Sequence, residues 1–266
     1  MKIHLAGDDA VMRDVAYDTG IPWVMTSYYY HKTAPTSGSG GDWKLDYRDE
    51  PECLGLMADS GAFTFIGNKS NQSADDIDWH EYAESYANWV RDNEIERWIE
   101  LDLDTPLSVE FSQELRDMME DIVGWDSMPV WHPPRGKSGF RKMAREYNRV
   151  CVGGFPWREI PERLWPKLLP WFIKTAHKHN ARIHALGFQP RVEVLNRYPF
   201  DSTDSANWMW NTTFGTMYEF TGDSIRCIEH DKEVTKDMYY QSLRAWARFA
   251  HYMDGRNEVS LPMGEW

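Results

Sequence analysis

The chain has 266 residues, a length that suits one α/β domain of the size of an eight-stranded barrel. Its 42 acidic side chains outnumber 29 basic ones, and the formal net charge of −13 excludes attraction of nucleic acid by the surface as a whole. Three cysteines without CxxC spacing exclude a disulfide framework and a cysteine zinc site, and the lack of a long apolar stretch predicts a soluble, unexported protein of the cytoplasm.

Short apolar stretches alternate with amphipathic ones along the chain. Strands are predicted at residues 3–6, 23–30, 54–58, 98–103, 128–131, 150–152 and 183–186 and in the segment before Asp201. Helices are predicted over residues 73–93 (capped by Ser73), 111–123 (closed by Gly124), 161–180 (broken or kinked at Pro166 and Pro170) and 234–253. This alternation is typical of a parallel sheet, and we expect a single (β/α)8 TIM-like barrel domain over residues 1–266.

Polar and glycine-rich motifs follow several of the predicted strands. They are DSG at residues 59–61, DLDTP at 102–106, WHPP at 131–134, GGF at 153–155 and DSTDS at 201–205. Because the carboxyl ends of the strands meet at one rim of a barrel, we expect these motifs to converge. Carboxylates at the ends of different strands can bring an acid/base and a nucleophile onto one substrate.

In this order the motifs resemble those of the tRNA-guanine transglycosylase superfamily, in particular its shorter phage and bacterial DNA-guanine transglycosylases. The likeness runs from about Leu54 to Trp208. DSGAF at residues 59–63 is similar to the family's DSGGF element and implies that Asp59 is the general acid/base. LDLDTP at residues 101–106 is similar to FDECTP, whose aspartate binds the guanine base, and this match favours Asp102 over Asp104.

Two further segments complete the base pocket that the resemblance implies. VGGF at residues 152–155 is similar to the family's IGGL segment, and His132 stands where the family carries a base-reading glutamine. The implied base-binding residues are Ser60, Gly61, Phe63, Asp102, Asp104, His132, Gly153, Gly154 and Phe155.

The nucleophile of the family is the second aspartate of a D-x-x-D-[SC] pattern. Residues 201–205, DSTDS, reproduce this pattern, so the resemblance implies that Asp204 is the nucleophile and that Asp201 is a cap or a supporting partner, with the reverse assignment left open. The family's cysteine zinc site is missing from this sequence, which is similar to the DNA-modifying branch. We therefore expect neither a metal nor another cofactor.

These residue types suit base exchange on chemical grounds as well. Breaking a glycosidic bond passes through an oxocarbenium-like state, which a carboxylate such as Asp204 can trap as a covalent sugar intermediate. A second carboxylate, Asp59, can move the proton of the departing and incoming bases. A third, Asp102, can accept hydrogen bonds from the N–H groups of a guanine edge.

The expected function is therefore exchange of guanine in DNA for a 7-deazaguanine of the preQ0 type, which gives modified phage or plasmid DNA that resists restriction. The expected partners are DNA with a flipped or unpaired guanine and the free 7-deazaguanine base, with no membrane and with a homodimer as an option. Aromatic rings at Phe63, Trp131, Phe155 and Trp208 are available for stacking. Phosphate contacts are expected from the most basic window, at Arg135, Lys137, Arg141, Lys142 and Arg145.

Three other functions remain open from the sequence. A carbohydrate-active glycoside hydrolase barrel would use the same paired acids with the many tryptophans. A tRNA-guanine transglycosylase would use the same chemistry on another nucleic acid. A catalytically silent barrel would use the aspartate motifs only as structural caps.

Overall fold

The structure is a computed structural model that describes residues 1–7, 10–33, 43–66, 76–105, 107–156, 158–188, 192–229 and 233–259. It is a mixed α/β fold made of two compact units, each assembled from separate stretches of the chain. Unit 1 comprises Met1–Met25, Asp42–Leu56 and Phe188–Trp266, and unit 2 comprises Thr26–Gly41 and Met57–Gly187. Among the described helices, none is both long enough and apolar enough to cross a membrane.

Seven strands belong to a parallel sheet, and two more form a separate antiparallel pair. The seven are β1 (Lys2–Leu5), β2 (Trp23–Ser27), β3 (Gly55–Asp59), β4 (Val130–Trp131), β5 (Arg149–Val152), β6 (Arg182–Ala185) and β7 (Ser202–Ser205). The last strand was expected before Asp201 but follows it. Its sequence, STDS, has no apolar residue, although all four of its residues are buried.

The fourth of the eight predicted strands, at residues 98–103, is not a regular strand, so the expected closed eight-stranded barrel is not seen. This segment of unit 2 makes only isolated parallel bridges, from Trp98 to Ala58 and from Ile99 to Met128. The amide of Val130 donates a 2.6 Å hydrogen bond to the carboxylate of Glu100. A continued parallel ladder would give that amide to a backbone carbonyl, so the Glu100 side chain ends the pairing.

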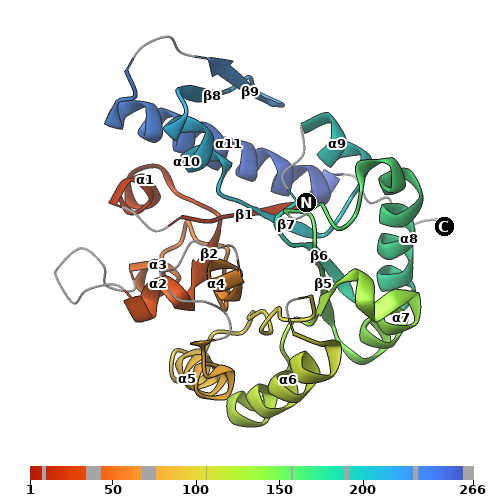
Figure 1. The fold of residues 1–266 in the computed structure, drawn as a ribbon. Coiled ribbons are helices and arrows are strands. Elements are labelled where there is room, and N and C mark those ends of the chain that lie inside the picture. The colour runs from red at the N-terminus through yellow and green to blue at the C-terminus, as the bar shows by residue number, and fades with distance from the viewer. Residues whose placement is uncertain are drawn as a thin grey trace. The chain divides into compact units, whose positions relative to one another are not determined.

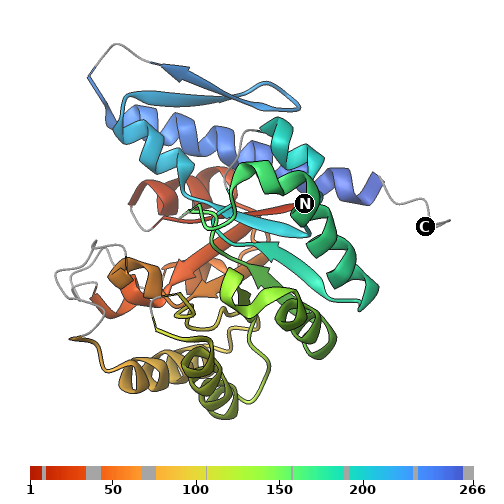
Figure 2. The same cartoon turned by 45° about the vertical axis from the view of Figure 1, so that its right-hand side comes forward.

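Unit 1 is built around β1, which pairs with β2 through Leu5 and Val24 and with β7 along its full length. The helices of this unit are α1 (Ala10–Thr19), α3 (Trp43–Tyr47), α9 (Val192–Arg197), α10 (Asn207–Thr213) and α11 (Lys236–Val259). Figures 1 and 2 show α11 beside α10 and the antiparallel pair of β8 (Thr216–Phe220) and β9 (Ile225–Glu229). The helix predicted over residues 234–253 is thus confirmed as α11.

Unit 2 contains the parallel strands β4, β5 and β6, with Val152 of β5 paired to Trp131 on one side and to Ala185 on the other. Its helices are α2 (Tyr28–Thr33), α4 (Ala62–Ile66), α5 (Trp79–Asp92), α6 (Val109–Val123), α7 (Gly136–Glu146) and α8 (Trp165–Lys178), with short 3-10 helices η2 (Pro133–Arg135) and η3 (Glu162–Leu164). Both views show α5 beside α6 and α7 beside α8 (Figures 1 and 2).

Three helix boundaries in unit 2 test the sequence predictions. Helix α5 begins at Trp79 and is capped by Asp78, not by Ser73, which lies outside the described residues. Gly124 ends α6 with a left-handed φ of 89°, as predicted. Helix α8 runs without a break, because Pro166 falls in its first turn, where a missing amide costs little, and Pro170 is accommodated inside it.

The cap of α5 gives a stability prediction. The carboxylate of Asp78 accepts hydrogen bonds of 3.1 Å from the amides of His80 and Glu81. We expect Asp78→Ala to lower the free energy of unfolding by about 1 kcal/mol, because two amides of the first turn lose their acceptor. Urea unfolding followed by circular dichroism measures the change. Glu84→Ala, an exposed position inside the same helix, is the control, and an equal loss in both variants would contradict the cap.

Candidate functional site

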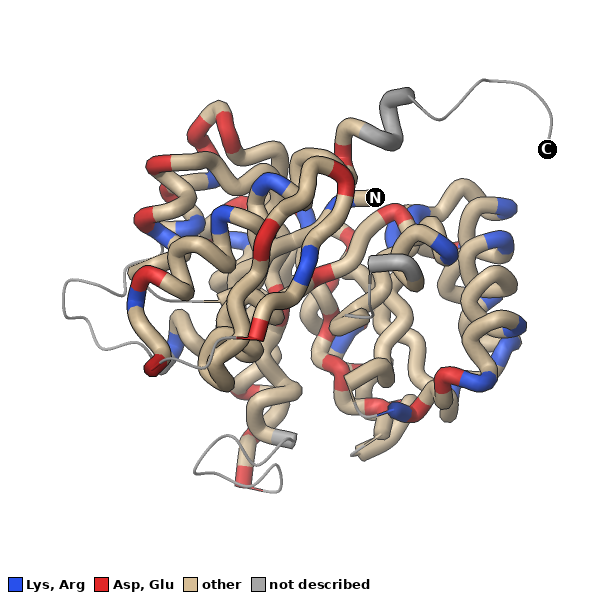
Figure 3. The backbone as a smooth tube through the Cα atoms, turned by 90° about the horizontal axis from the view of Figure 1, so that it is seen from above, with Lys and Arg blue, Asp and Glu red and all other residues tan. Residues whose placement is uncertain are grey.

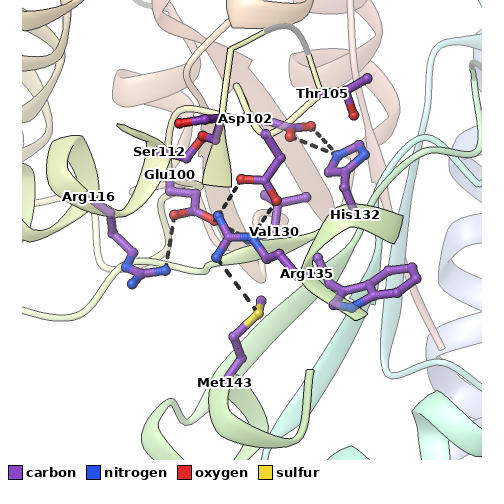
Figure 4. Close-up of polar contacts among 12 residues, drawn as sticks. Glu100, Asp102, Thr105, Ser112, Arg116, Val130, His132, Arg135 and Met143 are labelled. Carbon is purple, nitrogen blue, oxygen red and sulfur yellow. Dashed lines mark hydrogen bonds and ion pairs between the residues drawn. The ribbon is translucent and has the colours of Figure 1, made fainter. Parts of the chain in front are cut away.

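A chain of polar side chains in unit 2 links Asp102 to Thr105 through His132 and Glu159. His132 comes directly after β4, and its Nε2 lies 2.7 Å from Oδ1 of Asp102. The other ring nitrogen, Nδ1, lies 2.7 Å from Oε2 of Glu159. The hydroxyl of Thr105 donates to Oε1 of Glu159 at 3.0 Å. Figure 4 shows the Asp102 carboxylate joined to the His132 ring, with Thr105 close to the ring.

The two carboxylates fix the charge of His132. Burial by itself lowers the pKa of this histidine, but the charge of Asp102 and the hydrogen bonds to Asp102 and Glu159 outweigh it and raise the pKa to about 10. The hydrogen bond from His132 lowers the pKa of Glu159, and burial opposes that shift. His132 is therefore an imidazolium at neutral pH that donates from both nitrogens.

The adjacent glycines Gly153 and Gly154 allow this chain to pack. A Cβ atom built on Gly153 would lie 2.4 Å from Nε2 of His132, and one on Gly154 would lie 2.8 Å from Oε2 of Glu159. Gly154 also has a φ of +79°, which favours glycine. The glycine pair that the sequence places in a base pocket therefore lies directly against the histidine and its carboxylate partner.

A second cluster of charged side chains in unit 2 is fully buried. The guanidinium of Arg135 forms a two-point ion pair with Asp104, with 2.7 Å from Nη2 to Oδ1, and also reaches Glu100 at 3.0 Å. Arg116 from α6 approaches the other oxygen of Glu100 at 3.3 Å. Two carboxylates thus face two guanidinium groups (Figure 4). Burial raises the pKa of Glu100, and the two guanidinium groups and the Val130 amide oppose that shift.

Because of this cluster, the two aspartates of the DLD motif have different environments. The side chain of Asp104 is 1% exposed and committed to Arg135, whereas that of Asp102 is 23% exposed. A carboxylate has about four acceptor positions, and one N–H of His132 leaves Asp102 with capacity for a ligand. The structure therefore differs from two predictions. Asp104 was expected to bind a base, but its buried side chain pairs with Arg135. Arg135 was expected at a phosphate contact, but its side chain is 3% exposed and held in the interior by its two acidic partners.

The Asp59 motif forms a tight turn at the end of β3, also in unit 2. Oδ2 of Asp59 accepts a 3.1 Å hydrogen bond from the amide of Gly61, and the carbonyl of buried Ser60 accepts one of 2.7 Å from the hydroxyl of Tyr82. Gly61 has a φ of +77°, and a Cβ there would lie 2.4 Å from Cβ of Tyr29. The turn thus holds Asp59 half-buried at the strand end, as the sequence predicts, with Phe63 half-buried in the next turn of chain.

Asp201 and Asp204 lie in unit 1, at opposite ends of β7. Asp201 precedes the strand, and its carbonyl accepts the amide of Lys2, while Asp204 is the third strand residue and is paired with His4 of β1. Three residues of extended chain separate their Cα atoms by roughly 10 Å. Because Asp204 lies near the carboxyl end and Asp201 at the amino end, only Asp204 occupies the position that the sequence analysis assigns to the nucleophile.

The rings expected to stack on a base are mostly core residues. Trp208 is 0% exposed and donates from Nε1 to the carbonyl of Ala6 at 2.8 Å. Trp131 and Phe155 are also buried, Trp131 against Phe172 and Phe155 near Trp165. Of the four, Phe63 alone is half-buried and not fully buried.

The remaining cations of the predicted phosphate-binding window lie on α7. Lys137, Arg141, Lys142 and Arg145 are exposed. Lys142 pairs with Glu146 at 3.9 Å, and both Lys137 and Arg141 lie over the ring of Trp171 from α8, at 4.9 and 5.5 Å from its centroid. Four of the five predicted cations are therefore accessible to a partner.

Two residues that the sequence analysis missed complete the site. Glu100 lies between the apolar residues Ile99 and Leu101 of WIELDL, and an acid flanked by apolar residues in a buried segment is a signal for an internal ion pair. Glu159 lies in an irregular loop, and its sequence surroundings give no signal, because its contact with His132 spans 27 residues.

Comparison with models of known protein families finds no match for this chain, and comparison with curated proteins finds no similar sequence. Within the described part of the chain, no group of three or more His, Cys, Asp or Glu side chains is arranged to hold a metal ion.

The packing of Gly153 gives a second prediction. We expect Gly153→Ala to lower the free energy of unfolding by roughly 1–3 kcal/mol, because the added methyl group overlaps the His132 ring. Gly255→Ala in α11 is the matched control, since nothing lies within 4 Å of its Cβ position, and it is expected to be neutral or stabilising. Urea unfolding of both variants measures the difference, and a neutral Gly153→Ala would contradict the tight packing.

The charge of His132 gives a third prediction. Because its folded-state pKa, about 10, lies above the ordinary value of 6.5, its ion pairs stabilise the fold fully below about pH 6.5 and are lost as the pH rises through about 10. Wild-type protein should lose more free energy of unfolding between pH 7 and 10 than His132→Gln. NMR of labelled histidine should show this ring protonated on both nitrogens at pH 8, and a neutral ring at that pH would contradict the assignment.

Proposed function

We propose that this chain exchanges guanine in DNA for a 7-deazaguanine base of the preQ0 type. One observation carries the proposal. Four residues of the predicted base-binding set, Asp102, His132, Gly153 and Gly154, come from three separate segments of unit 2 and converge on one point. Convergence of a set chosen from the sequence alone supports the resemblance that selected it.

The state of Asp102 suits recognition of a guanine edge. His132 donates a hydrogen bond to the Asp102 carboxylate, whose oxygens are hydrogen-bond acceptors. The N1–H and N2–H groups of guanine and of 7-deazaguanines are donors that such a carboxylate accepts. The buried Arg135 cluster takes Asp104 out of this role, so Asp102 is the aspartate that we assign to the base.

The proposed reaction has two steps. The carboxylate of Asp204 attacks C1′ of the deoxyribose and forms an ester bond, while the bond from C1′ to N9 of guanine breaks and Asp59 supplies the proton that the departing base needs. In the second step N9 of the incoming base attacks C1′, Asp59 accepts its proton, and the Asp204 carboxylate is released. The target base must leave the helix before the first step.

The fold proposal that accompanies this function is a variant (β/α)8 barrel. The segment at residues 98–100 bridges to Ala58 on one side and to Met128 on the other, as a fourth barrel strand would do. In this proposal the Glu100 carboxylate replaces part of that strand's ladder. The irregular segment then delivers Asp102 to the carboxyl end of its neighbours, where barrel enzymes bind substrates.

The test uses the purified protein with guanine-labelled double-stranded DNA, single-stranded DNA or tRNA and with preQ0, followed by nucleoside mass spectrometry. We expect a 7-deaza nucleoside in DNA with the wild type, and a loss of at least 1,000-fold in exchange rate with Asp204→Asn, because the nucleophile is removed. Asp201→Asn is the matched control from the same motif and should retain exchange. Intact-protein mass spectrometry should detect a DNA adduct on the wild type and none on Asp204→Asn.

Other results would redirect the assignment. Exchange confined to tRNA would overturn the DNA substrate, and loss of exchange in Asp201→Asn with activity in Asp204→Asn would reverse the two aspartates. Release of sugar from an oligosaccharide panel without base exchange would favour a glycoside hydrolase.

A further inference from the structure

Basic side chains are concentrated in one part of this acidic chain. Residues 135–182 hold 12 of the 29 lysines and arginines but only three of the 42 aspartates and glutamates. The rest of the chain therefore has 17 basic and 39 acidic side chains. From residue 163 to residue 182, which includes all of α8, there is no acidic residue.

The structure places two rows of these cations on neighbouring helices. On α7, Lys137, Arg141 and Arg145 recur every four residues and are exposed. On α8, Lys167, Lys174 and Lys178 recur at spacings of seven and four and are also exposed. Residues at these spacings share one face of a helix. Each row therefore forms a stripe along its helix.

Trp171 joins the two stripes into one surface. It lies on α8 between Lys167 and Lys174, on the same face as both, and Lys137 and Arg141 of α7 lie over its ring. The Trp171 ring also packs against the rings of Phe140 and Phe172. Among the described residues, no carboxylate comes within ion-pair distance of five lysines and arginines of the two stripes, which are Lys137, Arg141, Lys167, Lys174 and Lys178.

The other helix pair of unit 2 carries the opposite charge. Helices α5 and α6 hold eight acidic side chains and two basic ones, and one of the basic ones, Arg116, is buried in the Glu100 cluster. Figure 3 shows the backbone positions of both kinds of charge. A polyanion is therefore attracted to α7 and α8 and repelled by α5 and α6, which fixes the side from which it approaches.

We propose that the surface formed by α7 and α8 binds the phosphate backbone of nucleic acid without reading its sequence. Its cations step along α7 by about 6 Å, the rise of four helical residues, which suits the regular phosphate repeat of a nucleic-acid strand better than the irregular charge of an acidic peptide. The choice of nucleic acid over other polyanions rests on the proposed function. The stripe on α8 adds three cations to the α7 window that the sequence indicates.

The decisive experiment measures binding separately from base exchange. The probe is a fluorescent 30-base-pair duplex of oligo(dA) and oligo(dT), which contains no guanine, and the Kd is measured by anisotropy from 50 to 200 mM NaCl. The test variant is Lys167→Ala/Lys174→Ala/Lys178→Ala. The matched control, Arg91→Ala/Arg226→Ala/Lys236→Ala, removes the same charge from exposed positions on α5, β9 and α11.

We expect the α8 variant to weaken binding roughly tenfold or more at 100 mM salt and to reduce the slope of log K against log salt by about 2–3, because three phosphate contacts are lost. The control should stay within about twofold of the wild type. Thermal unfolding of both variants checks that the helices are intact.

Three results would overturn the proposal: equal binding by the α8 variant and the wild type, equal loss in the control, or binding of anionic phospholipid vesicles or polyglutamate with none of the duplex. Because the probe has no guanine, failure of base exchange leaves this measurement unaffected. If the wild type exchanges guanine but the α8 variant binds the duplex as tightly as the wild type, the proposed binding surface is refuted and the proposed function is not.

Discussion

The buried carboxylate of Glu100 is the interaction on which the rest of unit 2 depends. It accepts the amide of Val130 and ion pairs from Arg116 and Arg135, so it ties together α6, β4 and the start of α7. A carboxylate in this position is stable only while its cations stay with it, and removal of one partner of a buried ion pair typically costs about 3–5 kcal/mol. The charge therefore sets the local geometry and not only the stability.

Two consequences follow for the site. The carboxylate takes an amide that would extend the ladder, so the chain after Ile99 leaves the sheet and carries Asp102 toward His132. The same arginine that pairs with Glu100 also pairs with Asp104. Of the two aspartates in this motif, Asp104 is buried in an ion pair with Arg135, whereas Asp102 is 23% exposed beside His132.

Charge is also organised on a larger scale. In unit 2 the buried cations Arg116, Arg135 and His132 are all paired with carboxylates, whereas most of the exposed cations of α7 and α8 are not. Because isolated surface cations add little to stability, their concentration in an acidic chain has no evident structural cause. The proposed binding of nucleic-acid phosphates accounts for this concentration of exposed cations.

The sequence by itself determined the class of the fold, the positions of most strands and the composition of the motifs. The strand β5 could be found because three of its four residues, Val150, Cys151 and Val152, are apolar and buried, and the end of α6 could be found because Gly124 favours a left-handed turn.

Only the tertiary structure decided what depends on partners distant in sequence. The strand STDS is polar and becomes a strand because β1 pairs with it. His132 becomes a cation because two carboxylates from other segments enclose it, and Arg135 becomes an interior residue because Glu100 and Asp104 meet it there. Local patterns report burial and turns, but the charge and exposure of a side chain are set by neighbours that the chain brings together only when it folds.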